Sequence, residues 1–294
     1  MKQAKRNVCS QLIVICILPS LLLSIIANGV DAFDCASNDT STSLKVGAFN
    51  IKSFGRAKMR NQDVRTTIVD IVNRYDIVLI QEVRDKSGAA INTLWSQLNS
   101  TDNWGMVKSE RLGRSQRYKE QYVFFYRTGR IISVGSYQDE DPFDIYEREP
   151  FSVQFVYISN DNLHRIVLLG LHAKPDDVPA ELNQLPSSIG AVSDYFSVNK
   201  VIAMGDFNAD CSYASSRELA EMDIFQENSG FVSLIPDTED TTQSSTHCAY
   251  DRIVVYGDVN ACCGNVYNFQ EELNLSPSHA KSVSDHYPVE FELN

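Results

Sequence analysis

Short apolar runs that end abruptly in polar residues constrain the fold of this chain more than any other feature. The apolar residues 201–204 lead into Gly205 and Asp206, and the apolar residues 77–80 lead into Gln81 and Glu82. Runs of this length are typical of buried strands. A nearly continuous apolar run, without polar alternation, indicates a strand that is covered on both faces. The chain is therefore predicted to build sheets that lie inside the molecule.

The remaining periodicity indicates helices outside those sheets. Apolar residues recur at helical spacing within residues 64–75 and 91–98, and more weakly within residues 178–196. Strands are predicted at residues 44–51, 76–83, 121–128, 131–137, 150–158, 164–173, 201–207, 249–257 and 286–293. This order favours an α/β four-layer sandwich, in which two packed mixed β-sheets are flanked by α-helices.

The first 32 residues have the pattern of a secretory signal peptide. Basic residues at positions 2, 5 and 6 precede an apolar run that ends in small residues around position 32. An uncleaved membrane anchor is the alternative, because the run is near the lower length for a spanning helix. Residues 33–294 contain no linker-like tract, so we expect them to form a single domain, although the length alone would also permit two.

Charge and cysteine content limit the function classes. The formal net charge is −12, which argues against nucleic-acid binding by overall electrostatics and requires local basic residues or a bound metal for any polyanionic partner. The five cysteines beyond the signal segment are an odd number for an oxidising compartment. They are Cys35, Cys211, Cys248, Cys262 and Cys263.

Polar residues gather at the predicted strand ends. Any single one is more often a turn residue, or a histidine that is satisfied within the core, than a catalyst. As a group they indicate a site at one sheet edge: Asn50, Glu82, His172, Asp206, Asn208, Asp251, Asp285 and His286.

The chemistry of these residue types points to metal-assisted hydrolysis of a phosphodiester. Carboxylate oxygens are the ligands that Mg²⁺ or Mn²⁺ prefers, and histidines oriented by carboxylates such as Glu120 and Asp251 transfer protons near neutrality. The chain has no HExxH, Walker, GxSxG or GxGxxG motif. Acyl transfer and hydride transfer therefore fit less well.

At this level of detail the sequence resembles the deoxyribonuclease I family, within the endonuclease/exonuclease/phosphatase superfamily. The resemblance covers residues 44–294 and rests on eight blocks in family order. They read VGAFNIKSFG, RYDIVLIQEVRD, LGR with YKEQYVFFYR, GLHAKP, MGDFNADCSY, IPDTEDTT, CAYDRIVV and SDHYPVE. The resemblance implies a secreted, divalent-metal-dependent endonuclease that cuts double-stranded DNA with little sequence specificity and leaves 5′-phosphate ends.

The resemblance also implies residue roles. His172 with Glu120, and His286 with Asp251, would be the general acid and base pairs. Asn208 would hydrogen-bond the scissile phosphate, and Asp206 would be a further catalytic residue close to the metals. The implied ligands of the catalytic Mg²⁺ or Mn²⁺ are Glu82, Asp285, Asn50 and Asp206.

Contacts with DNA would run through the minor groove and the phosphates, at Arg84, Tyr118 and Arg148. Nearby basic residues that could add positive charge are Lys52, Arg114, Arg117 and Lys119. Where some relatives bind actin through a Tyr–Val patch, this chain has Met106-Val107-Lys108, which argues against actin inhibition. We expect a monomer without a membrane anchor.

Structural elements of the family are only partly matched. Cys211 and Cys248 would form the main disulfide, and Cys35 is a plausible partner of Cys262 or Cys263. One structural Ca²⁺ would be held by Asp240, Thr242 and Thr246. A second would be held by Asp139 or Asp141, with Asp144 and Glu149, in a loop that is shorter than in the longest relatives.

Two other functions remain open at this stage. The first is a phosphodiesterase of the same superfamily that acts on sphingomyelin or phosphoinositides. The second is a catalytically inactive secreted binding protein on the same scaffold, although all matched catalytic positions are intact. Glycosylation sequons begin at Asn38, Asn99 and Asn274.

Overall fold

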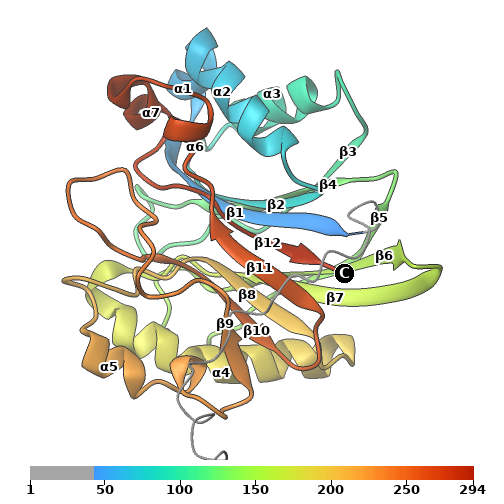
Figure 1. Ribbon diagram of the computed structural model, residues 1–294, viewed down its shortest axis with the longest axis vertical. Coiled ribbons are helices and arrows are strands. Elements are labelled where there is room, and N and C mark those ends of the chain that lie inside the picture. Colours follow the sequence, from blue (N-terminus) through green and yellow to red (C-terminus); the bar gives the residue numbers. More distant parts are fainter. Residues whose placement is uncertain (1–42) are drawn as a thin grey trace, which may run out of the picture. The chain divides into compact units, whose positions relative to one another are not determined.

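Two six-stranded sheets lie face to face in the computed structural model, which describes residues 43–294 (Figure 1). The first sheet has the strand order β11-β12-β1-β2-β4-β3. Its strands are β1 (Leu44–Phe54), β2 (Ile77–Val83), β3 (Trp104–Lys108), β4 (Gln121–Arg127), β11 (Ala261–Val266) and β12 (Val289–Leu293).

The second sheet has the order β5-β6-β7-β8-β10-β9. Its strands are β5 (Ile131–Gln138), β6 (Phe151–Ser159), β7 (Asn162–Gly170), β8 (Val201–Asp206), β9 (Phe231–Ser233) and β10 (Asp251–Tyr256). Both sheets are mixed, since β1 pairs parallel with β2 and β7 pairs parallel with β8.

Helices cover the outer faces of both sheets. On the first sheet lie α1 (Arg56–Arg60), α2 (Gln62–Asn73), α3 (Ala89–Leu98), α6 (Phe269–Glu272) and α7 (Pro277–Val283) (Figure 1). On the second lie α4 (Val178–Phe196) and α5 (Ser216–Ala220), with the short 3₁₀ turns Pro175–Asp177 and Asp223–Phe225 nearby. The expected four-layer sandwich is therefore confirmed.

Three apolar clusters hold these layers together. The central cluster lies between the sheets and includes Leu79, Phe124, Phe155 and Leu168. A second cluster joins the first sheet to its helices, and a third joins the second sheet to α4. Sheets covered on both faces explain why β2 and β8 are apolar along nearly their whole length.

The strand ends bring the predicted polar residues to one edge of the sandwich. In β1 and β2, Asn50 lies opposite Gln81. In β8 and β10, Asp206 lies opposite Asp251. Because β1 runs parallel to β2 and β7 runs parallel to β8, the carboxyl ends of these strands deliver their side chains to the same edge.

Two earlier expectations fall on the undescribed part of the chain. The signal peptide at residues 1–32, and any bond of Cys35, lie outside the described residues. The described residues all belong to one compact unit. Within them, no helix combines the length and apolar character needed to span a bilayer.

Candidate active site

Asp206, the last residue of β8, lies at the centre of the site. Gly205 has φ +132°, and a Cβ at this position would be 2.4 Å from the Leu171 carbonyl oxygen. Gln81 joins the two sheets: its amide donates to that carbonyl at 2.7 Å and accepts from the Asp206 backbone N–H at 2.9 Å. The close approach of backbones at Gly205 thus fixes where the Asp206 carboxylate leaves the strand.

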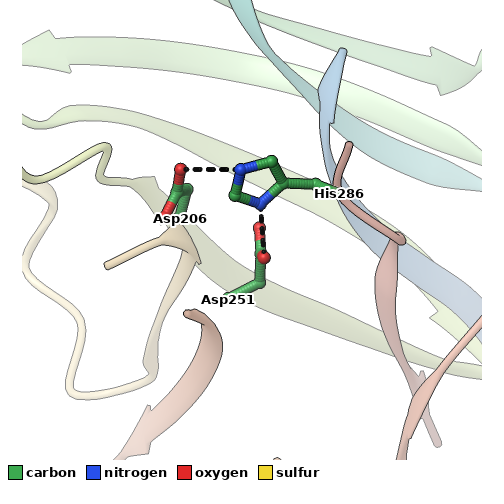
Figure 2. A group of neighbouring side chains, drawn as sticks. All are labelled: Asp206, Asp251 and His286. Carbon is green, nitrogen blue, oxygen red and sulfur yellow. Dashed lines mark hydrogen bonds and ion pairs between the residues drawn. The ribbon is translucent and has the colours of Figure 1, made fainter. Parts of the chain in front are cut away.

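His286 lies between two carboxylates, as Figure 2 shows. Its Nδ1 is 2.8 Å from Asp251 Oδ2, and its Nε2 is 3.6 Å from Asp206 Oδ2. Asp206 and Asp251 are directly opposite on neighbouring antiparallel strands. Like charges in that arrangement repel each other, so a positive charge between them is stabilising.

A second histidine–carboxylate pair faces the same aspartate. His172 Nδ1 is 2.6 Å from Glu120 Oε1, and His172 Nε2 is 3.4 Å from Asp206 Oδ2. Arg148 supports this pair, because its Nε donates to the His172 carbonyl at 2.9 Å and lies 3.3 Å from Glu120. Both imidazoles therefore present Nε2 to one carboxylate oxygen from two sides.

The pKa of each histidine is raised by the carboxylates around it. Burial alone would lower the pKa of His286, but Asp251 and Asp206 outweigh it and raise that pKa to about 10. Burial and Arg148 likewise oppose protonation of His172, yet Glu120 and Asp206 raise its pKa. Both rings are thus favoured as imidazolium donors in the protein alone.

The pKa values of the two carboxylate partners, Glu120 and Asp251, shift in opposite directions. Burial tends to raise the pKa of Glu120, but the charges of His172 and Arg148 lower it. Burial raises the pKa of Asp251, where His286 opposes and Asp206 reinforces the shift. Glu120 is the better stabilised anion of the two because a permanent guanidinium charge lies beside it.

Two asparagines complete the polar centre. Asn50 Nδ2 donates to Asp206 Oδ2 at 2.9 Å, and Asn208 Nδ2 donates to the Ala173 carbonyl at 2.9 Å. Asn208 has φ 48°, and Glu82 has φ 56°. Left-handed backbone at non-glycine residues costs free energy, and such residues are concentrated at functional sites.

The oxygen donors here fit a hard divalent cation. The Asn50 side-chain oxygen is buried and has no hydrogen-bond partner, while the other half of the amide is already engaged with Asp206. Glu82 Oε2 accepts from the Ser53 N–H at 2.7 Å, and Asp285 pairs with Lys52. An unsatisfied buried oxygen beside carboxylates is a feature that Mg²⁺ coordination would satisfy.

A different group also has metal-like spacing. Ligand atoms of Asp206, Asp251 and His286 lie within 4.8 Å of one another. Asp251 Oδ2 and His286 Nδ1 are already bonded to each other, however. We therefore interpret these two residues as a proton-transfer pair and Asp206 as the residue shared with a cation site.

The predicted DNA-contact residues take two different positions. The Arg84 guanidinium lies 5.3 Å from the Tyr118 ring, and Tyr118 is 58% exposed. Arg148 instead lies beneath the surface, and its Nη2 atom is buried without a partner. Arg84 and Tyr118 form an accessible pair, whereas the contacts of Arg148 are mainly with the His172–Glu120 pair.

The loop that follows Asp206 is fastened to the strand that carries Asp251. The structure contains a Cys211–Cys248 disulfide with a Cα–Cα distance of 5.9 Å. Within this loop Asp240 Oδ1 accepts from Thr242 N–H and from Cys248 N–H, and Thr242 Oγ1 is 3.4 Å from the Thr246 carbonyl. The residues expected for the first Ca²⁺ are thus neighbours.

The residues expected for a second Ca²⁺ are less concentrated. Asp141 accepts from the Ile145 and Tyr146 N–H groups, and Asp139 accepts from the Asp141 N–H. Asp144 pairs with Arg114. The Glu149 carbonyl accepts from Gln138. The charge of one expected ligand, Asp144, is therefore already balanced by an arginine.

The adjacent cysteines are not bonded to each other. Their Sγ atoms are 3.6 Å apart, which is well beyond a disulfide bond length. Cys262 is a buried free thiol, whereas Cys263 is disulfide-bonded. Because Cys35 lies outside the described residues, its pairing stays a prediction.

Several supporting residues were not assigned a role from the sequence. Tyr122 accepts the His172 N–H at 2.8 Å, and Thr241 Oγ1 accepts the Asp251 N–H at 3.1 Å. Gln81 joins both sheets, and Glu181 accepts from the Glu147 N–H. A glutamine within an apolar strand is a detectable signal, since a buried amide requires partners; the others carry no distinctive pattern.

The two-sheet sandwich and its paired imidazoles and carboxylates define this protein as a phosphoester hydrolase. Residues 47–286 match the model of the endonuclease/exonuclease/phosphatase family. The chain belongs to that family, and its relatives place it in the deoxyribonuclease I group.

Those relatives match over most of the chain. Deoxyribonuclease-1 of Gallus gallus is 42% identical over 265 residues, which is 86% of this chain and 93% of the relative. Deoxyribonuclease-1-like 2 of Mus musculus is 40% identical over 257 residues, which is 85% of this chain and 91% of the relative.

Solved structures share the fold at low identity. The D. rerio TDP2 complex with a single-strand DNA product has a TM-score of 0.61 at 14% identity, and the match covers 86% of this chain and 99% of that one.

Proposed function

We propose that this protein is a secreted, divalent-metal-dependent endonuclease that hydrolyses double-stranded DNA with little sequence specificity. The observation that carries the proposal is the convergence of two histidine–carboxylate pairs on Asp206. The relatives named deoxyribonuclease, at 40–42% identity over most of the chain, support DNA as the substrate.

The geometry suits an in-line displacement at phosphorus. His172 and His286 each bind a carboxylate through Nδ1, so Nε2 is left to exchange a proton. One ring would accept a proton from the attacking water, for which it has to be neutral, a state favoured when the charge of Asp206 is shared with a cation. The other ring, as imidazolium, would supply a proton to the leaving 3′-oxygen. The products would then carry 5′-phosphate and 3′-hydroxyl ends.

The remaining polar residues would hold the phosphate and the metal. Asn208 would donate to a non-bridging oxygen, with its backbone fixed by the bond from its N–H to Asp206 Oδ1 at 3.0 Å. Glu82, Asp285, Asn50 and Asp206 would hold Mg²⁺ or Mn²⁺. Such an ion, when bound, neutralises charge on the phosphoryl oxygens.

Exposed residues near the catalytic histidines would contact the DNA. Arg84 and Tyr118 would contact the phosphates and the minor groove, and Arg148 would set the position of His172 from below. Contacts of this kind position a duplex and carry little sequence information. Asp240, Thr242 and Thr246 would bind a structural Ca²⁺ that stiffens the disulfide loop.

A nicking assay tests the proposal directly. Purified protein would be incubated with supercoiled plasmid in EDTA, in Mg²⁺, and in Mg²⁺ with Ca²⁺, and in parallel with sphingomyelin and phosphoinositide vesicles. We expect nicked plasmid only with the metal, ends that ligate without prior phosphorylation, and no lipid headgroup release. Lipid hydrolysis without nicking would favour the phosphodiesterase alternative, and binding without turnover of any substrate would favour the inactive binding protein.

A further inference from the structure

Three arginines surround one pocket on the helical layer of the first sheet. The pocket has a volume of about 420 Å³ and is lined by Arg56, Met59, Arg60, Arg65, Ala89, Ala90 and Thr93. It lies where α1 and the start of α2 meet the beginning of α3, and α1 contacts both of these helices. Buried Met59 contributes an apolar wall between the basic side chains.

These guanidinium groups lack the partners that most other arginines have. Within residues 43–294, none of the three forms a salt bridge, whereas eight other arginines do. Arg65 donates to the Met59 carbonyl at 2.9 Å. Arg56 and Arg60 are exposed. Three arginines without a salt bridge around a hollow form a local positive patch on a chain with a formal net charge of −12.

Asp85, an acidic side chain close enough to interact with Arg56, is already engaged. Burial tends to raise the pKa of Asp85, but the hydrogen bonds from Ala90 and Ser87 and, to a smaller extent, the charge of Arg56 lower it. Asp85 Oδ2 accepts from the Ala90 N–H at 2.9 Å, and Oδ1 accepts from Ser87. Asp85 therefore caps the start of α3 instead of forming an ion pair with the pocket arginines.

Helix α1 connects the pocket to the candidate active site. Arg56 and Arg60 are four residues apart and share one face of the helix. Lys58 is on the other side, where its ammonium donates to the Val283 carbonyl, two residues before Asp285. Ser53, three residues before Arg56, donates its N–H to Glu82 Oε2, so α1 begins beside the metal-ligand edge.

We propose that this arginine pocket binds a backbone phosphate of the DNA substrate, outside the nucleotides that are cleaved. The inference rests on the proposed function. A duplex presents one negative charge about every 1.7 Å along its axis, so a strand held at Asp206 passes further phosphates over the adjacent helix. A pair of exposed arginines suits a phosphate because each guanidinium can donate two parallel hydrogen bonds.

The test is the salt dependence of duplex binding, measured by fluorescence anisotropy in EDTA for wild type and Arg56→Gln/Arg60→Gln. We expect the slope of log K against log salt to fall by about 0.9 in magnitude, since the pocket holds one phosphate and each phosphate contact contributes about 0.9. Affinity near 50 mM salt should fall on the order of tenfold. Arg60→Gln alone should reduce the slope by less than the double substitution does, because Arg56 still faces the same phosphate.

The matched control is Arg165→Gln/Arg217→Gln, which removes the same charge from exposed residues on β7 and α5. An equal slope change in the control would overturn the inference, because net charge alone would then explain it. An unchanged slope in the pocket variant would overturn it too. This also holds if that variant binds inorganic phosphate, titrated in a separate experiment, more weakly than wild type does. If wild type binds the duplex but never cuts it, the proposed function is wrong. The salt slopes of the variants would still show whether the pocket binds a phosphate.

Discussion

Each candidate catalytic histidine has one ring nitrogen fixed by a carboxylate and one directed at Asp206. This arrangement leaves one proton-transfer atom per ring, at Nε2. Loss of a general acid or base commonly costs roughly 10²–10⁴-fold in rate, so His172→Ala should lower plasmid nicking by on the order of 10²-fold or more. The measurement is kcat at saturating plasmid.

A histidine on the preceding strand provides the control for that substitution. His164 stacks on Tyr157 at a ring-centroid distance of 5.1 Å and lies near the opposite end of β7. His164→Ala should leave kcat within about twofold, because Brønsted-type catalysis requires contact with the reacting group. Equal turnover in wild type and His172→Ala would contradict the assigned role.

The buried carboxyl group of Glu181 should make the stability of the fold depend on pH, independently of the proposed metal site. Its Oε1 accepts from the Glu147 N–H at 3.0 Å and the Lys174 N–H at 3.3 Å, while Oε2 is buried without a partner. Burial raises its pKa from 4.5 to about 7. Between these two pH values the unfolded chain has released a proton that the folded chain retains, so stability falls as pH rises.

The substitution Glu181→Gln should remove this pH dependence. Denaturant unfolding at pH 5 and pH 8 should show that the variant gains up to about 3 kcal/mol relative to wild type at the higher pH. Glu227→Gln, on an exposed loop residue, is the control and should follow wild type. A Glu181→Gln variant that loses stability equally at both pH values would show that the carboxylate acts only through hydrogen bonding.

Among the elements, the end of β8 leaves little room for change. A Cβ on Gly205 would meet the Leu171 carbonyl oxygen and the Gln81 amide at 2.4 and 2.5 Å, at φ +132°. Overpacking and a forbidden backbone conformation each cost roughly 1–3 kcal/mol. Gly205→Ala should therefore destabilise the fold by about 3 kcal/mol or more and move Asp206.

A glycine in α4 gives the opposite expectation. Gly190 is exposed and has no atom within 4 Å of its would-be Cβ. Gly190→Ala should stabilise the protein by roughly 0.5–1 kcal/mol, because alanine favours helix more than glycine does. Urea titration of both variants measures the contrast, and a Gly205→Ala protein as stable as wild type would refute the close approach of backbones.

The long periodic elements were predictable from sequence and the short ones were not. Residues 178–196 were predicted as a helix and form α4 with the same bounds. β3, β9 and β11 were missed. β9 has only three residues, and β11 contains Gly264, whose Cβ would meet the Leu234 carbonyl oxygen at 2.1 Å. Pairing partners, not local propensity, create such strands.

The same distinction applies to the site. Strand-end polar residues could be predicted as a group, because parallel strands deliver their ends to one edge. Their partners depend on tertiary contacts: Gln81 binds across to Leu171, and Thr241 Oγ1 accepts from Asp251. No sequence spacing specifies those contacts, since the paired residues lie 90 and 10 positions apart.

For the whole molecule, the candidate site exists only where the two sheets are packed together. Asn50 and Gln81 come from the first sheet, and both bind Asp206 of the second. His286 precedes β12 of the first sheet but pairs with Asp251 on β10 of the second. Separation of the sheets would thus break both histidine–carboxylate pairs and the Asp206 contacts of Asn50 and Gln81 at once, so activity and global folding should be lost together.

This assembly concentrates carboxylates on an already acidic molecule, which predicts that Mg²⁺ stabilises the fold. An ion that binds only the folded state at 100 times its Kd contributes about 2.7 kcal/mol, and for a domain of this size that raises Tm by roughly 5–10 °C. Wild type should show this rise in thermal unfolding with increasing Mg²⁺. Glu82→Gln, which keeps an acceptor for the Ser53 N–H but removes the charge, should show a smaller rise in Tm.

NaCl at matched ionic strength controls for screening of the net charge. If NaCl reproduces the rise, or if Glu82→Gln responds like wild type, the carboxylate edge is not the place where the cation binds.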